Sequence, residues 1–294
     1  MTRAATGVTM HDSSAPRRER HAALVVSTFL IAPVIIGALY SLGASLGLVG
    51  AGATGFGVQR LADVLGDGST WRSVGWTLLT AGSGTALATG AAMLVATALR
   101  GTRALRTLLA VPLALPHAAG ALAILLLLGQ SGILARVAFA LGWIDTPSDF
   151  PALVYDRPGV GLVVAFAWKE FPFLTLSALA VLETRGDEHE EAARTLGATP
   201  AMTLRHVTLP LLWRGIAPAV IAVFAFLLGQ YEMAVLLAPS DPLPLSILTY
   251  ERSTDIDLAR RGGAHVLALL ALLLAVGLVV FHQRTLDALG EDRR

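Results

Sequence analysis

The sequence predicts an all-α polytopic membrane protein with six membrane-spanning helices. Two observations support this fold class. Apolar residues make up 54% of the 294-residue chain, while charged residues make up only 15%, well below the roughly 25% of soluble domains. Six apolar runs are also long enough to cross a bilayer, because about 20 residues at 1.5 Å rise cover a ~30 Å hydrocarbon core.

The six runs divide the chain into spans and connecting segments. Residues 1–21, before the first run, are expected to form a disordered cytoplasmic tail, and residues 284–294 a cytoplasmic C-terminal tail. The first run is too long, and its exit too rich in glycine, for a cleavable signal peptide, so we expect it to stay as an anchor. The expected spans are residues 22–46, 74–99, 105–128, 160–182, 216–237 and 264–281.

The distribution of arginine predicts how these spans are oriented. If the N-terminus lies inside, the inner segments hold fourteen arginines and the outer segments hold seven. Inner segments of membrane proteins carry an excess of basic residues. We therefore expect both termini to face the cytoplasm, together with the charged segment 184–213 between the fourth and fifth spans.

Three outer connectors are expected at residues 47–71, 130–159 and 239–263. The first is rich in glycine and contains a short amphipathic piece at 58–65. The other two carry aromatic and acidic residues, which suit the membrane interface or an external partner. Solvated connectors are the alternative for all three.

The charged segment between the fourth and fifth spans predicts a helix, a sharp turn and a second helix. Asp187 is expected to cap the first helix, because an acid at a helix start accepts free backbone N–H groups. Gly197 is expected to end it in a left-handed conformation. Thr199 and Pro200 then have the residue types of a new helix start, and Pro210 is expected to close the unit.

Charged residues also stand where lipid would reject them. Lys169, the only lysine, and Glu170 lie about nine residues into the fourth run, hence roughly 14 Å deep at 1.5 Å per residue. Trp168 precedes them and Pro172 follows, so we expect a kinked helix with freed carbonyl groups.

Two further polar breaks interrupt apolar runs. They consist of Pro112, Pro116 and His117 in the third run, and Gln230, Tyr231 and Glu232 in the fifth. One interpretation of all these breaks is a translocation pathway with a ligand site at mid-depth. The other is a structural network in which Lys169 pairs with Glu170 or Glu232. His117 is expected to be a hydrogen-bonded bundle histidine rather than a ligand.

The spacing in the charged segment is specific. It reads Glu191-Ala192-Ala193, three residues, Gly197, nine residues, Val207, one residue, Leu209-Pro210. This pattern resembles the signature loop of the membrane-spanning permease subunits of binding-protein-dependent (type I) ABC importers. It departs from that loop only in having valine at position 207, where the family pattern has isoleucine. The resemblance covers roughly residues 71–281.

The resemblance implies roles for two sets of residues. The charged segment would be a coupling loop that sits in a cleft of an ATPase subunit, with coupling carried by Glu191, Ala192, Ala193, Gly197, Leu209 and Pro210. Two polar runs resemble stretches of the polyamine, thiamine, phosphonate and ferric-iron permease groups. They would border the translocation pathway with Trp168, Lys169, Glu170, Gln230, Tyr231 and Glu232.

The resemblance also implies a function and partners. Residues 22–283 would form a six-span permease domain, in the bacterial cytoplasmic membrane, that carries a small solute delivered by an extracytoplasmic binding protein. A second permease, identical or related, would complete the pathway. Two cytoplasmic ATPase subunits would bind ATP and Mg, so this chain itself would be neither an enzyme nor a holder of a cofactor.

Several other chemistries are excluded by composition. The chain has no cysteine, which removes disulfide, zinc-thiolate and iron–sulfur chemistry. A phosphate-binding loop needs Gly-Lys followed by Ser or Thr, but the sole lysine follows a tryptophan. The net charge of +1 gives no argument for binding nucleic acid.

Two alternatives come from other functional classes. The run Gly129-Gln130-Ser131-Gly132 has the form of a rhomboid-type intramembrane serine protease, and His265 opens the sixth span as a possible base. A serine without its base and oxyanion donors is not a nucleophile, and this reading would leave the charged segment unexplained. The second alternative is a secondary transporter, whose uptake would need no ATPase partner.

Overall fold

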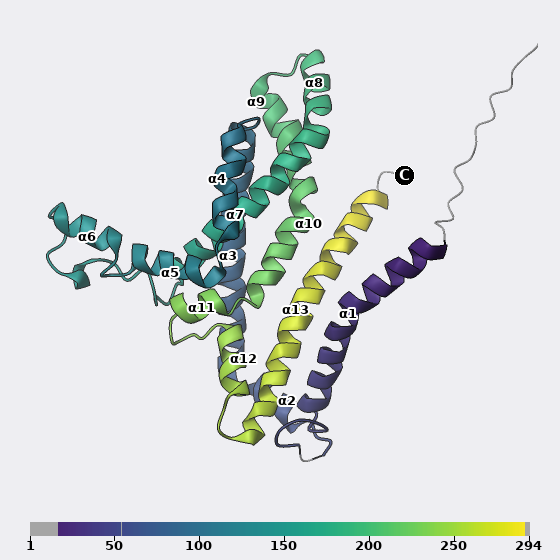
Figure 1. The fold of residues 1–294 in the computed structure, drawn as a ribbon, viewed down its shortest axis with the longest axis vertical. Helices are drawn as coiled ribbons and strands as arrows, with labels where there is room; N and C mark the ends of the chain where they lie inside the picture. Colours follow the sequence, from purple (N-terminus) through teal and green to yellow (C-terminus); the bar gives the residue numbers. More distant parts are fainter. Residues whose placement is uncertain (1–16, 54, 292–294) are drawn as a thin grey trace, which may run out of the picture.

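The computed structural model describes residues 17–53 and 55–291, and within them every regular element is helical (Figure 1). This confirms the all-α fold class. The α-helices are α1 (Arg17–Ser45), α2 (Gln59–Gly66), α3 (Gly68–Ala98), α4 (Arg103–Ala114), α5 (His117–Leu128), α6 (Ile133–Ala140), α7 (Val160–Val181), α8 (Asp187–Thr195), α9 (Pro200–Thr203), α10 (Leu209–Leu228), α11 (Glu232–Leu237), α12 (Leu245–Ser253) and α13 (Leu258–Glu291). A 3₁₀ turn, η1 (Pro147–Asp149), and two π-turns, η2 (Leu182–Gly186) and η3 (Leu204–Thr208), complete the set.

Six helical segments of the described chain are long and apolar enough to cross a membrane, which confirms the predicted number. They are Leu24–Ser45, Gly68–Ala98, His117–Ala140, Val160–Thr195, Pro200–Leu228 and Leu258–Arg284. The predicted 58–65 piece corresponds to α2, whose Val64 is buried. The outer connectors hold more helix than expected, since α6 and α12 lie within them.

The third span is where the prediction was wrong. The expected single run 105–128 is broken between α4 and α5 at Leu115 and Pro116. Proline has no backbone N–H and its ring clashes with the preceding turn, so the helix stops and restarts. Helix α4 packs against α7, whereas in Figure 1 α5 and α6 extend away to the left.

The fifth span also differs from its predicted bounds of 216–237. Helix α10 begins earlier, at Leu209, and ends at Leu228, and α11 is a separate short helix after it. The polar residues 230–232 therefore mark a true break. At the chain ends, α1 begins at Arg17 and α13 runs to Glu291, so parts of both predicted tails are helical; residues 1–16 and 292–294 lie outside the described residues.

The centre of the bundle is the packing of α3 against α7. Small residues let the two helices approach closely. A Cβ atom added at Gly84 would lie 2.7 Å from Cβ of Phe166, which is itself only 2% exposed. The hydroxyl groups of Thr80, Thr85 and Thr89 on α3 bond back to carbonyl oxygens one turn earlier, which satisfies polar groups that lipid cannot.

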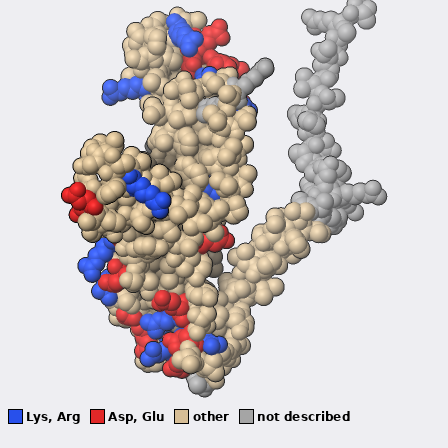
Figure 2. Space-filling model, turned by 60° about the vertical axis from the view of Figure 1, so that its left-hand side comes forward, with Lys and Arg blue, Asp and Glu red and all other residues tan. Residues whose placement is uncertain are grey.

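Charged side chains gather at the two ends of the bundle (Figure 2). At one end Asp67 caps α3 by accepting from the Ser69 backbone N–H at 2.8 Å and pairs with Arg252 at 3.3 Å. The hydrogen bonds from Ser69 lower the pKa of Asp67. The first turns of α1 and the last turns of α13 point toward the opposite end, which carries α8 and α9 (Figure 1).

The Gly84 contact yields a test of the α3–α7 packing. Gly84→Ala is expected to destabilise the protein by about 1–3 kcal/mol, because the added methyl group has no room. Gly90→Ala is the matched control, since a Cβ there meets no atom within 4 Å. In a helix that change stabilises by roughly 0.5–1 kcal/mol. Thermal unfolding in detergent measures both, and equal midpoints would contradict the packing.

Candidate functional site

The charged segment forms a helical hairpin that extends the fourth and fifth spans. Helix α7 continues through the π-turn η2 into α8 without interruption. The prediction that Asp187 caps a new helix is therefore wrong: its φ and ψ of −61° and −47° are helical. The π-turn keeps the backbone hydrogen-bonded while it admits the charged residues, so no separate helix start is needed.

The turn at the tip of the hairpin agrees with the prediction. Gly197 has a φ of +85°, and its N–H donates to the Arg194 carbonyl at 2.9 Å. The hydroxyl of Thr199 then accepts from the Met202 N–H at 3.3 Å, and Pro200 begins α9. Left-handed φ favours glycine because it lacks a Cβ, so this position fixes the reversal of the chain.

The prediction that Pro210 closes the second arm of the hairpin is wrong. Helix α9 continues through η3 into α10, and Pro210 is the second residue of α10. Proline inside a continuous helix clashes with the carbonyl four residues earlier, which here belongs to His206 in the π-turn. The wider π-turn relieves that clash.

The predicted coupling residues occupy both arms of this hairpin. It projects from one end of the bundle (Figure 1), and Leu196 beside the turn is 88% exposed. Glu191, Ala192, Gly197 and Pro210 are exposed, and Ala193 and Leu209 are half-buried. The hairpin thus presents a largely free surface.

The contact between Arg100 and Glu190, which joins the hairpin to the bundle, was not predicted from the sequence. Arg100, just after α3, pairs with Asp187 at 2.7 Å and with Glu190 at 3.1 Å. Asp187 and Glu190 stand three residues apart, the spacing of neighbours on one helix face. That spacing was the available signal, but nothing in the sequence pointed to their partner.

The mid-span charges contact the break between α4 and α5. Lys169 is 4% exposed, and its Nζ donates to the Pro112 carbonyl at 2.9 Å. That carbonyl lies four residues before Pro116, which has no N–H to offer it. Glu170 is 8% exposed and lies 3.5 Å from Nε2 of His117, the first residue of α5.

These contacts differ from the predicted pairing of Lys169 with Glu170 or Glu232. Within residues 17–53 and 55–291, Glu170 lies against His117 instead. Lys169 donates to a carbonyl oxygen. Two adjacent side chains of α7 therefore hold the two helix ends created by Pro116.

The third polar break lies close to the other two. The ring of Phe226, in the last turn of α10, lies 5.3 Å from that of His117, and α11 packs against α5 and α7. Gln230 is buried, and its carbonyl accepts from the Ser246 hydroxyl at 3.1 Å. Tyr231 is half-buried and Glu232 is exposed. Trp168, also half-buried, faces Gly120 of α5.

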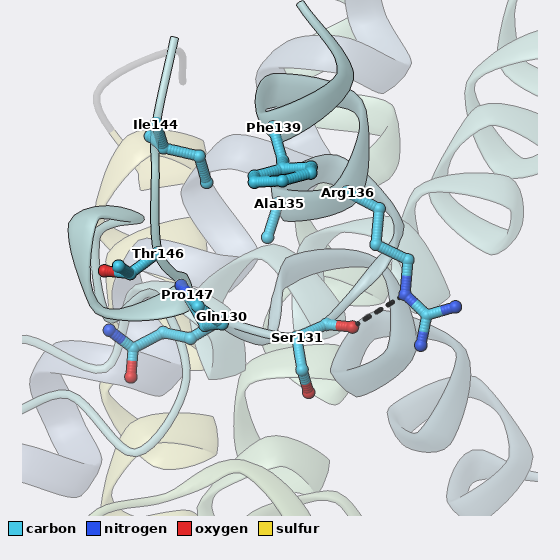
Figure 3. Close-up of a pocket in the computed structure, with 8 residues that line it drawn as sticks. All are labelled: Gln130, Ser131, Ala135, Arg136, Phe139, Ile144, Thr146 and Pro147. Atoms are coloured by element: carbon cyan, nitrogen blue, oxygen red, sulfur yellow. Dashed lines mark hydrogen bonds between the residues drawn. The ribbon is translucent and has the colours of Figure 1, made fainter. Parts of the chain in front are cut away.

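The structure places Ser131 and His265, the residues of the protease alternative, on different elements of the fold. Ser131 lines a cavity of about 360 Å³ between α6 and the following segment, and its carbonyl accepts from Nε of Arg136 at 3.1 Å (Figure 3). His265 lies instead on α13, where its Nδ1 is 3.3 Å from the Ser41 hydroxyl of α1. These contacts give no catalytic pair.

The fold and the hairpin define a helical membrane permease. The chain belongs to the family described as binding-protein-dependent transport system inner membrane components, which matches residues 84–288. It is a permease subunit of an ABC importer, and the family is a transport component rather than an enzyme.

Individual relatives agree with this assignment. The chain is 32% identical over 197 residues to the molybdenum transport system permease protein ModB of Mycobacterium tuberculosis, covering 65% of this chain and 68% of the relative. It is 32% identical over 138 residues to the sulfate transport system permease protein CysT of Salmonella typhimurium, covering 47% and 46%. The predicted likeness to polyamine, thiamine, phosphonate and ferric-iron permeases stays a prediction.

A solved structure shares the fold. It is a bacterial alginate ABC transporter in complex with an alginate pentasaccharide-bound periplasmic protein. The TM-score is 0.66 at 17% identity, and the match covers 90% of this chain and 93% of the other.

Replacement of Lys169 tests whether its hydrogen bond to the Pro112 carbonyl stabilises the break between α4 and α5. Lys169→Ala is expected to destabilise the protein by about 1–3 kcal/mol, because the Pro112 carbonyl loses its charged donor and keeps only the Leu115 N–H at 3.3 Å. Glu170→Gln keeps an acceptor for His117 and is expected to cost less. Thermal unfolding in detergent compares them, and an unchanged midpoint for Lys169→Ala would show that the lysine does not hold the break.

Proposed function

We propose that this permease takes its energy from two cytoplasmic ATPase subunits, one of which holds its α8–α9 hairpin in a cleft. The observation that carries the proposal is the hairpin itself, which projects from the bundle with Leu196 88% exposed at its tip. Both of its arms are continuous with spans. A movement imposed on the tip is therefore delivered directly to α7 and α10.

The coupling residues have distinct parts in this proposal. Glu191 offers an exposed carboxylate to the ATPase, and Ala192 and Ala193 let its surface approach closely. Gly197 fixes the reversal at the tip, while Leu209 and Pro210 define where the second arm enters its span. Closure of the ATPases would rock the bundles from inward-facing to outward-facing.

The other partners follow from the family. A second permease, the same chain or a related one, would complete the pathway, and an extracytoplasmic binding protein would deliver the cargo. ATP and Mg would be held by the ATPase subunits. We place residues 22–283 as the permease domain in the bacterial cytoplasmic membrane, with the hairpin and both termini cytoplasmic, in keeping with the arginine bias.

The pathway is proposed to run beside the three polar breaks, bordered by Trp168, Lys169, Glu170, Gln230, Tyr231 and Glu232. Relatives named for molybdenum and sulfate support an inorganic oxyanion as the cargo, since molybdenum in neutral water is the oxyanion molybdate. Purification of the complex and identification of the ion that its binding protein carries tests this. Uptake without any attached ATPase would overturn the proposed energy source.

A substitution at the hairpin tip tests coupling. Gly197→Val is expected to abolish most uptake while the complex still assembles, because a left-handed conformation costs a side-chain-bearing residue about 1–2 kcal/mol and valine resists it most. Gly142→Val is the matched control. Gly142 also has positive φ, +71°, with open space around its Cβ position, but it lies far along the chain after α6.

Uptake and ATP hydrolysis are measured in proteoliposomes for both variants. Uptake by Gly197→Val equal to that by Gly142→Val would contradict the assigned role of the turn.

A further inference from the structure

We propose that Arg100 and Glu190 clamp the hairpin to the end of α3, so that hairpin and spans move as one rigid body. The proposal rests on the proposed function, because it states how a movement of the hairpin reaches the rest of the bundle. Neither residue belongs to the signature spacing. Both are positioning residues, since they act through the hairpin rather than on cargo.

Arg100 binds the first arm of the hairpin at three points. Its guanidinium donates to the Leu182 carbonyl at 2.9 Å, to Asp187 at 2.7 Å and to Glu190 at 3.1 Å. Leu182 is the first residue of η2, and the two acids lie on α8 beyond it. One side chain from the turn after α3 thus holds the backbone at the start of the π-turn and two side chains beyond it.

Glu190 extends the same network to the second arm. Its Oε1, which accepts from Arg100, also accepts from the Thr208 hydroxyl at 2.9 Å. Thr208 is the last residue of η3 and is 5% exposed. Arg194 lies 3.5 Å from the other oxygen of Glu190. A single carboxylate therefore links α3, α8 and the second π-turn.

The network lies where the hairpin would otherwise bend most easily. Each arm joins its span through a π-turn, and π-turns interrupt the regular hydrogen-bond ladder and often mark functional sites. Arg100 holds η2 and Glu190 reaches η3. Coupling between distant sites needs a contiguous, stiff physical connection, and these contacts supply it across both joints.

The surroundings favour a strong interaction. The Arg100 and Glu190 side chains are 24% and 13% exposed, and a charged hydrogen bond removed from water is stronger than one at the surface. Gly186 makes room for it, because a Cβ there would lie 2.8 Å from a guanidinium nitrogen of Arg100. The absence of a side chain at Gly186 therefore leaves room for the Arg100 guanidinium.

A nearby ion pair provides a matched comparison. Arg106 of α4 pairs with Glu183 of η2, but their side chains are 55% and 47% exposed. Exposed pairs contribute little, and this one touches only the first arm. Substitution of this pair changes the same kinds of charge in the same region without releasing the second joint.

The first experiment measures rigidity directly and needs no knowledge of the cargo. The chain has no cysteine, so Glu188→Cys on α8 and Leu94→Cys on α3 give two unique spin-label sites. Both positions are exposed. The distance distribution between them, measured by pulsed electron resonance in the complex, is expected to be narrow and equal with and without ATP.

Added to this labelled chain, Arg100→Gln and Glu190→Gln are expected to broaden the distribution and make it shift with ATP. Arg106→Gln is expected to leave it unchanged. The double exchange Arg100→Glu with Glu190→Arg is expected to narrow it again. A distribution that stays narrow in Arg100→Gln, or that is already broad in the parent, would overturn the clamp.

The second experiment measures transmission across the bundle. In the parent complex, we expect loaded binding protein on one side to stimulate ATP hydrolysis on the other. In Arg100→Gln that stimulation is expected to fall at least about fivefold, the lower range of coupling between sites, while basal hydrolysis persists. Stimulated and basal rates that fall by the same factor would show a merely structural role and refute the proposal.

The two proposals fail in different ways. If no ATPase binds the hairpin in the parent, the proposed function fails, whatever the distance measurement shows. If the ATPase binds and is stimulated equally in Arg100→Gln and Arg106→Gln, only the clamp fails.

Discussion

The break that Pro116 makes in a helix, inside a protein that lipid surrounds, is the constraint on which much of this structure depends. Pro116 cannot donate to the Pro112 carbonyl, and hydrocarbon offers no water in its place. The Leu115 N–H reaches this carbonyl at 3.3 Å, and Lys169 adds a second hydrogen bond at 2.9 Å. The Lys169 side chain is thereby buried next to Glu170, which lies 3.5 Å from His117. The break at Pro116, the hydrogen bond from Lys169 and the sideways course of α5 are therefore parts of one arrangement.

Elsewhere in the bundle, too, polar groups find hydrogen-bond partners within the protein. Threonine hydroxyls on α3 bond to their own helix, and Gly84 lets α3 approach Phe166 of α7 closely. At the end of the bundle that carries α8 and α9, Arg100 donates to the Leu182 carbonyl and to the Glu190 carboxylate. The charged groups discussed here thus lie at helix interruptions, and the interruptions are where the function is proposed to lie.

The sequence predicted those features that depend on local chemistry. Six apolar runs gave the spans, and the reversal at Gly197 and the helix start at Thr199 follow from conformations that few residue types favour. The continuity of α7 into α8 was not predicted, because no particular residue types mark a π-turn in the sequence as glycine marks a left-handed turn. The contacts of Lys169 and Arg100 were missed because their partners lie 57 and 87 residues away in the chain.

The two π-turns also bear on how the hairpin could vary among related chains. A π-turn holds one residue more than the α-helical turn it replaces, and each residue of an α-helix adds about 100° of rotation and 1.5 Å of rise. The π-turn absorbs its extra residue within one full turn, so loss of one residue from η2 or η3 would restore an ordinary α-helical turn and leave the direction of the tip nearly unchanged. A single-residue insertion or deletion in the regular part of an arm would instead rotate the tip by about 100°. Related permeases could therefore lose or gain a residue at these two joints and still present the same hairpin surface to an ATPase.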